Sequence, residues 1–227
     1  PLFGLDGIPF LATSYAEAKK LQDIQVPALD KYLAAQGIKI LYTVPWQPQG
    51  IFSKKPIASV ADMKGMKWRS YSPSTAKMAE LMAMQPVTIQ AAELSQALAT
   101  GIIETYISSS ATGIDSKTYE SLKYFYEAQA WLPKNAVIVS IKAFNALDKA
   151  EQEAVLKAAA QAQERGWKIS EEKETAFKQT LKERGMTIEM PTPAFAADLK
   201  KVGDVLLAEW EKKAGAEGAT LINAYRK

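Results

Sequence analysis

The chain has 227 residues, of which 48% are hydrophobic and 23% charged, a composition typical of a folded globular protein. Its 28 Lys and Arg against 25 Asp and Glu leave a formal charge of +3, too small and too scattered to indicate a nucleic-acid or membrane surface. Histidine and cysteine are both absent. Disulfides, thiol nucleophiles and Cys-ligated metals are therefore excluded, and the commonest general base is missing.

These two absences make catalysis the less favoured class of function. Enzymes that use Ser–Lys, Lys Schiff-base or carboxylate chemistry need neither residue, so this class stays open, whereas a binding protein needs no such chemistry. The sequence contains no phosphate loop or dinucleotide fingerprint, and we expect no cofactor. No stretch reaches the ~20 apolar residues of a transmembrane helix, so we expect no direct insertion into a membrane.

Capping signals and apolar runs divide the first half of the chain into helices and strands. Ser14 and Glu17 form a capping box that begins a helix expected to reach about Gln36. A buried strand follows at 38–44, and the prolines and glycine of 45–57 predict an irregular crossover. Next come a strand, a helix, a strand, a helix and a strand, expected at 66–71, 73–82, 86–89, 92–100 and 102–107. This order predicts a parallel α/β unit with right-handed crossovers.

The second half is dominated by one long helical pattern. After a strand at 135–141, Asp148 and Glu151 begin a helix that meets no proline before Pro191. If it continues to Arg184, it spans on the order of 55 Å, more than one lobe requires. We therefore predict that 148–184 braces two lobes, with a bend near Gly166. A strand at 186–190, a helix from Pro193 toward Lys213 and a short helix near 220–225 complete the chain.

The predicted fold class is α/β with two lobes, between which the chain crosses more than once. Lobe I is expected to comprise 1–45 and 133–165, and lobe II 46–132 and 186–227. Proteins of this architecture bind a ligand in the cleft between the lobes and close by hinge motion.

Arg69 is the leading candidate for a binding residue. It lies in an otherwise apolar strand, where period-2 alternation places it on the same face as Tyr71 and opposite Trp68. An arginine at the end of a parallel strand points into the crevice where open α/β sheets bind ligands, and its planar guanidinium matches a carboxylate. Pairing with an internal acidic residue is the alternative.

Aromatic and hydroxyl side chains provide the other candidates. Ser108 begins a serine cluster that could bind an anion, the alternative being a polar turn after a strand. Trp68 and Tyr124 are expected in the core. The rings expected to shape the cleft are Tyr71, Tyr106, Trp131 and Trp46.

The residues Asp62-Met63-Lys64-Gly65-Met66-Lys67-Trp68-Arg69 and Ala97-Leu98-Ala99-Thr100-Gly101, with Pro86-Val87 and Glu93-Leu94 between them, resemble the substrate-binding proteins of TRAP transporters, the DctP family. The likeness covers essentially the whole chain. It implies a periplasmic-binding-protein-like fold, a periplasmic location and an organic-acid ligand. It also implies delivery of that ligand to the membrane subunits of a sodium-driven TRAP transporter.

The resemblance also assigns roles to residues. The family arginine that matches Arg69 pairs with the ligand carboxylate, and Ser108 stands where many members have an asparagine that touches the same group. A second arginine that many relatives carry has no counterpart between Gln49 and Ile51. Fewer charges and more rings indicate a monocarboxylate, with aromatic, α-hydroxy and α-keto acids as the classes we consider.

Relatives begin with a signal peptide and with leading strand–helix units that precede the stretch matching Leu5 to Leu11. The resemblance therefore implies that lobe I is incomplete here and that the chain is the later part of a longer protein. Two other classes stay open: an enzyme on a two-lobe scaffold with a Lys or carboxylate base, and an intracellular effector-binding module.

Overall fold

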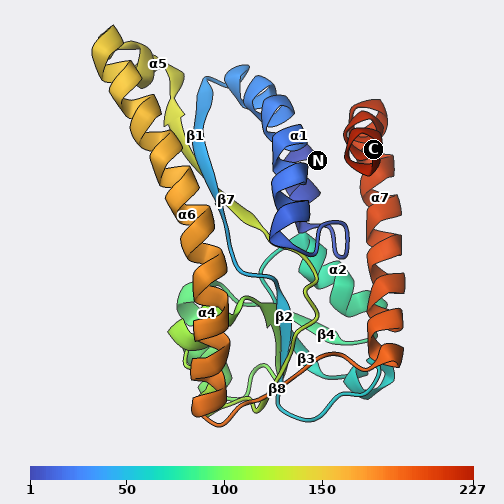
Figure 1. Ribbon diagram of the computed structural model, residues 1–227. Helices are drawn as coiled ribbons and strands as arrows, with labels where there is room; N and C mark the ends of the chain where they lie inside the picture. Colours follow the sequence, from blue (N-terminus) through green and yellow to red (C-terminus); the bar gives the residue numbers. More distant parts are fainter.

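The computed structural model describes all residues, Pro1 to Lys227, as two β-sheets with helices packed around them (Figure 1). The α-helices are α1 (Tyr15–Ala34), α2 (Pro73–Leu81), α3 (Leu94–Ala99), α4 (Ser110–Asp115), α5 (Ile141–Asn145), α6 (Lys149–Glu183) and α7 (Pro193–Arg226). Short 3-10 helices are η1 (Leu2–Gly7), η2 (Val60–Met63), η3 (Ala91–Glu93) and η4 (Thr118–Glu120). The strands are β1 (Ile38–Pro45), β2 (Gly50–Ser53), β3 (Lys67–Ser70), β4 (Gln85–Thr88), β5 (Thr105–Ser108), β6 (Tyr124–Tyr126), β7 (Lys134–Ser140) and β8 (Thr187–Glu189).

The larger sheet has six strands in the order β4-β3-β5-β2-β6-β8. Strand β3 is parallel to both β4 and β5, which confirms the predicted parallel unit. Strand β2 is antiparallel to its neighbours β5 and β6, so the complete sheet is mixed. The smaller sheet pairs β1 with β7 in antiparallel register, from Ile38 opposite Ser140 to Pro45 opposite Lys134.

Strand β2 lies within 45–57, where we expected no regular element, and that expectation was wrong. All four residues of β2 are buried, and Ile51 and Phe52 are fully enclosed between the flanking strands. Gly50 is required there, because a Cβ atom would lie 2.4 Å from Phe125 Cζ. The flanking prolines and the shortness of the strand conceal it in the sequence, and its long-range pairing stabilises it.

Apolar clusters cover both faces of the six-stranded sheet. On one face Trp68 packs with side chains of α2 and α7, among them Met78 and Phe195. On the other face Phe52 packs with α3 and with Leu181 at the end of α6. Adjacent residues of β2, β5 and β6 divide between the two clusters, as strand alternation requires.

The predicted long helix is confirmed as α6, which begins with the expected Asp148–Glu151 capping box. Its 35 residues extend about 52 Å at ~1.5 Å per residue, past the smaller sheet and down to α4 and β8 of the larger one (Figure 1). The helix is unbroken at Gly166, where we expected a bend. Gly166 instead allows α6 to approach β1, because a Cβ there would lie 2.6 Å from Val44 Cγ2.

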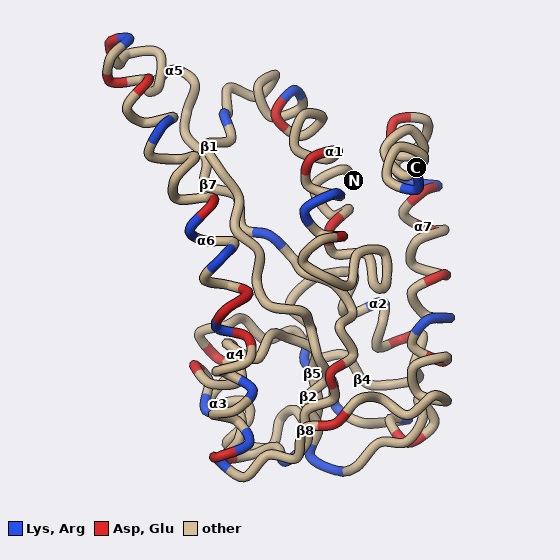
Figure 2. The backbone as a smooth tube through the Cα atoms, viewed as in Figure 1, with Lys and Arg blue, Asp and Glu red and all other residues tan.

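Helix α7 changes direction at Gly215, which has a positive φ of 61°. The break confirms the prediction of two successive helices. Before Gly215, α7 packs on the six-stranded sheet, and after it Ile222 and Tyr225 join a third cluster with Leu5 and Leu21. Along α6 and α7, charges of both signs are interspersed (Figure 2).

The strand predicted at 135–141 is present as β7 but is less buried than its apolar sequence indicates. Its residues are half-buried or exposed, and Val137 and Ile138 are 38% and 52% exposed. The smaller sheet therefore presents apolar side chains to solvent.

We predict that Gly166→Ala lowers the free energy of unfolding by about 1–3 kcal/mol, because the new methyl group collides with the stiff, β-branched Val44. In an unconstrained helix the same change stabilises by about 1 kcal/mol. Chemical denaturation measures the difference. Gly4→Ala, where a Cβ would meet nothing within 4 Å, is the control, and Val44→Ala should rescue Gly166→Ala. A stabilised Gly166→Ala protein would contradict the predicted close approach.

Candidate ligand-binding site

A cavity of about 370 Å³ lies at one end of the six-stranded sheet. Here the parallel strands β4, β3 and β5 finish and the antiparallel strand β2 begins. Open α/β sheets bind their ligands at this carboxyl edge. The lining residues are Trp46, Gln49, Arg69, Tyr71, Gln90, Ala91, Ser108, Ser109, Thr112, Pro133 and Asn135.

Arg69 brings the only charged side chain to this lining, and it is buried to 4% exposure. Its Nε donates a hydrogen bond of 2.9 Å to the carbonyl of Ile89, and its Cζ lies 4.9 Å from the ring centre of Tyr71. No carboxylate lies within ion-pair distance, which excludes the internal salt bridge that we considered. Burial lowers the pKa of Arg69 from its usual value, but a guanidinium remains charged in proteins.

A buried charge without a counter-charge costs several kcal/mol unless an opposite charge reaches it. Neither terminal nitrogen of Arg69 hydrogen-bonds within the protein, since its one hydrogen bond uses Nε. Both are free to donate to an anion in the cavity. The arrangement therefore favours a ligand with one carboxylate.

Among the side chains that line the cavity, Gln49 and Ser108 are also buried, at 3% and 7% exposure, and each keeps a polar atom without a hydrogen-bond partner in the protein. The register places them close together, because Gly50 pairs with Ser108. Arg69 of β3 pairs with Tyr106 of β5, the strand that also carries Ser108. Along the neighbouring strands β3, β5 and β2, the cavity edge thus has an arginine, a hydroxyl and, directly before β2, a carboxamide.

The structure brings four of the six predicted site residues together. Arg69, Ser108, Tyr71 and Trp46 all line the cavity. Trp46 stays 39% exposed, and burial raises the pKa of Tyr71 to about 12, so its hydroxyl is neutral at physiological pH.

Tyr106 and Trp131 do not line the cavity. Tyr106 is fully buried, stacks on Phe52 with ring centres 4.7 Å apart and shares a hydrogen bond with the Thr118 hydroxyl. Trp131 is 2% exposed and packs in the same cluster as Trp68, which lies in the core as expected. Both rings therefore belong to the core, Tyr106 on one face of the six-stranded sheet and Trp131 on the other.

Sequence reasoning missed the carboxamides Gln49, Gln90 and Asn135 as lining residues. Gln90 follows a predicted strand end, which was an available signal. Gln49 carries no such signal, because it lies in the proline-rich stretch between the two sheets.

The second wall of the cavity is a ribbon formed by 46–49 and 130–133, the two segments that cross between the sheets. Trp46 N donates to Pro133 O at 2.8 Å, Gln49 N to Trp131 O at 2.9 Å, and Ala130 N to Gln49 O at 2.9 Å. The two crossings are therefore hydrogen-bonded to each other, and they hold Trp46 and Gln49 in the lining of the cavity that also contains Arg69.

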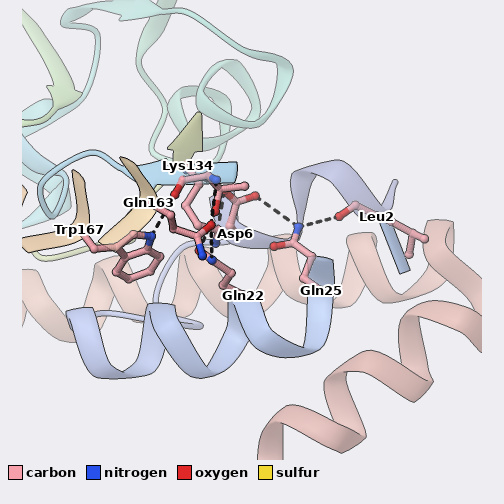
Figure 3. Close-up of polar contacts among 8 residues, drawn as sticks. Leu2, Asp6, Gln22, Gln25, Lys134, Gln163 and Trp167 are labelled. Carbon is pink, nitrogen blue, oxygen red and sulfur yellow. Dashed lines mark hydrogen bonds and ion pairs between the residues drawn. The ribbon is translucent and has the colours of Figure 1, made fainter. Parts of the chain in front are cut away.

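A buried ion pair anchors one end of this ribbon (Figure 3). Asp6 accepts a 2.8 Å hydrogen bond from the backbone N–H of Lys134, and its Oδ2 lies 3.6 Å from Lys134 Nζ. The two side chains are only 11% and 5% exposed. Burial lowers the pKa of Lys134, and the nearby Asp6 carboxylate opposes that shift.

A second polar network fixes α6 against β1 and α1 (Figure 3). Trp167 Nε1 donates to Thr43 O at 3.0 Å, and Gln163 Oε1 accepts from Thr43 N at 3.0 Å. Gln163 Oε1 also accepts from Gln22 Nε2 at 3.3 Å. Buried polar groups that are paired in this way hold elements in one arrangement.

The profile of DctP, the bacterial extracellular solute-binding proteins of family 7, matches residues 1–213. Two solved receptors from Bordetella pertussis, DctP6 and DctP7, are 56% and 44% identical to the chain, and both superpose with a TM-score of 0.98. Each superposition covers 100% of this chain and 75% of the receptor, and both receptors are described as binding pyroglutamic acid. An uncharacterized protein of Haemophilus influenzae is 27% identical over 94% of the chain, which spans 66% of that relative.

The fold and the matched profile define a bacterial solute-binding protein. The chain belongs to the DctP family, as the sequence predicted. The two-sheet α/β architecture with its long helix also matches the fold expected for this class. None of its helices combines the length and the apolar character that a membrane span needs.

We predict that Asp6→Asn lowers the free energy of unfolding by about 3 kcal/mol, because it leaves the Lys134 ammonium buried without its counter-charge. Lys134→Met should cost less, since Asp6 keeps the backbone N–H of residue 134, and the double variant should recover part of the loss. Urea denaturation provides the measurement. Lys178→Met breaks a more exposed ion pair with Glu127 and should cost at most about 1 kcal/mol. Equal costs for Asp6→Asn and Lys178→Met would show that burial of the Asp6 pair is unimportant.

Proposed function

We propose that the protein is the extracytoplasmic solute receptor of a TRAP transporter and that it binds a small monocarboxylate in the cavity at Arg69. The observation that carries the proposal is the buried guanidinium with two free terminal nitrogens and no acidic partner. We place the receptor in the periplasm, where it would pass its ligand to the membrane subunits of the transporter.

Pyroglutamate is the ligand that we propose. The support is the 56% and 44% identity with two receptors described as binding it, together with the chemistry of the cavity. Pyroglutamate has one carboxylate, a compact five-membered ring and a lactam with one N–H and one carbonyl. The lining offers one cation, two aromatic rings and three carboxamides, with no acidic side chain that would repel the carboxylate.

Each of four lining residues would then have a distinct role. Arg69 would hold the carboxylate with two parallel hydrogen bonds, and the Ser108 hydroxyl would add a third. Tyr71 backs the guanidinium, with its ring centre 4.9 Å from Cζ, and Trp46 covers the ring of the ligand. Tyr106 and Trp131 would contribute by holding this wall in place.

The two lobes proposed around this cavity are 1–45 with 133–165, and 46–132 with the stretch from residue 186. The hydrogen-bonded ribbon connects them, and α6 braces both. The end of α7 beyond Gly215 packs with Leu5 and Leu21, so we assign it to lobe I instead of lobe II. Ligand binding would draw the lobes together by hinge motion.

A receptor fits the cavity better than an enzyme. The alternative enzyme would need a lysine or carboxylate base beside the ligand, and the lining contains neither. Recovery of unchanged ligand after prolonged incubation, followed by mass spectrometry, supports the receptor, and turnover of the acid would overturn it.

We predict that Arg69→Lys weakens the binding of pyroglutamate by about 10–100-fold, since the ammonium keeps the charge but loses the planar pair of donors. Arg69→Met should abolish measurable binding. Isothermal titration calorimetry on the purified protein measures both.

Arg184→Lys is the matched control, because Arg184 also lies over a tyrosine ring, 5.6 Å from the centre of Tyr119, but does not line the cavity. It should leave the affinity unchanged. Unaltered affinity in Arg69→Lys would remove Arg69 from the proposed carboxylate contact.

A further inference from the structure

We infer that Gln49 accepts a hydrogen bond from an N–H group of the ligand, so that the site selects lactam carboxylates over analogues with oxygen in place of that N–H. The inference rests on the proposed function, in which Arg69 holds the carboxylate of the ligand. It goes further, because it assigns the choice among small cyclic acids to one side-chain oxygen.

The orientation of the Gln49 carboxamide is fixed by the protein itself. Its Nε2 donates a 3.0 Å hydrogen bond to the backbone carbonyl of Gln47. A carbonyl oxygen only accepts, so the NH₂ end of the amide must face Gln47 and the oxygen end must point elsewhere. The Oε1 atom accepts no hydrogen bond from any protein group, although the residue is only 3% exposed and lines the cavity.

The backbone around this amide is held equally firmly. Gln49 N donates to Trp131 O, and Gln49 O accepts from Ala130 N, both at 2.9 Å. Pro48 fixes its own φ and restricts the residue before it, and the Gln47 side chain donates to Ser170 O at 3.3 Å. The acceptor oxygen is therefore positioned before the ligand arrives.

The free polar atoms of Arg69, Ser108 and Gln49 differ in whether they donate or accept hydrogen bonds. Arg69 only donates, Ser108 both donates and accepts, and Gln49 Oε1 only accepts. A ligand whose carboxylate lies on Arg69 and Ser108 and whose ring carries an N–H toward Gln49 satisfies all three. If oxygen replaces the N–H, the lone pairs of that oxygen face those of Oε1, and the ligand shields Oε1 from water without giving it a donor, which a site of this kind rejects strongly.

The test compares pyroglutamate with the γ-lactone of 2-hydroxyglutarate, which has the same ring with oxygen in place of N–H. By calorimetry we expect the unmodified protein to bind the lactam at least about tenfold more tightly than the lactone. Gln49→Met should weaken lactam binding by about tenfold and should not weaken lactone binding, which improves to the extent that the opposed lone pairs of Oε1 penalised it, so the discrimination is lost.

Gln152→Met is the matched control. The Gln152 amide also donates 3.0 Å to a backbone carbonyl, that of Leu147, but lies on α6 away from the cavity. It should bind both acids as the unmodified protein does. The lactam-to-lactone ratio of the unmodified protein tests the inference even where Gln49→Met fails to fold.

The possible failures are distinguishable. Equal binding of both acids by the unmodified protein, with Arg69→Lys weakening both, overturns the role of Gln49 and leaves the proposed receptor intact. If Gln49→Met still binds the lactam more tightly than the lactone, the role of Gln49 is also overturned, because another group would then accept the hydrogen bond from the N–H. If neither acid binds, the proposed ligand and this inference fail together.

Discussion

The site depends on one guanidinium that is enclosed at the edge of a β-sheet without a counter-charge. Arg69 is held by a single backbone carbonyl and by the face of Tyr71, and both leave its paired terminal donors unused. Such a charge is costly to bury without a counter-charge, and the anion that we propose to bind here would offset that cost. The parallel order β4-β3-β5 directs this charge into the cavity.

The opposite wall has a different origin. It consists of two crossing segments that pair with each other, and their prolines keep them extended. Asp6 ties the far end of this ribbon to the first turn of the chain, and the Thr43–Gln163 contact ties β1 to α6. Because one wall belongs to the sheet and the other to the connections between sheets, we expect a rotation of one sheet against the other to change the width of the cavity.

The sequence identified the features that rest on local signals. Arg69 stood out as a lone charge in an apolar strand, and α6 as a capped pattern without proline. Strand β2 was not predicted, because its stability comes from partners more than 50 residues away in the chain. The sequence could not show that Tyr106 lies in the core and not in the cavity. All residues of β5 are buried, so strand alternation separates the two faces of the sheet but does not indicate which residues line a cavity. The orientation of Gln49 depends on a carbonyl two residues earlier, which no pattern of residue types records.

Trp46 gives the cavity a further property. The chain has five tryptophans, of which Trp68 and Trp131 are buried in the core, whereas Trp46 stands half-open at the cavity and belongs to the ribbon that joins the sheets. The fluorescence of an indole shifts in wavelength when water around it is replaced by protein or ligand. If the proposed ligand binds beside Trp46, we therefore expect binding to shift the emission spectrum of the unlabelled protein.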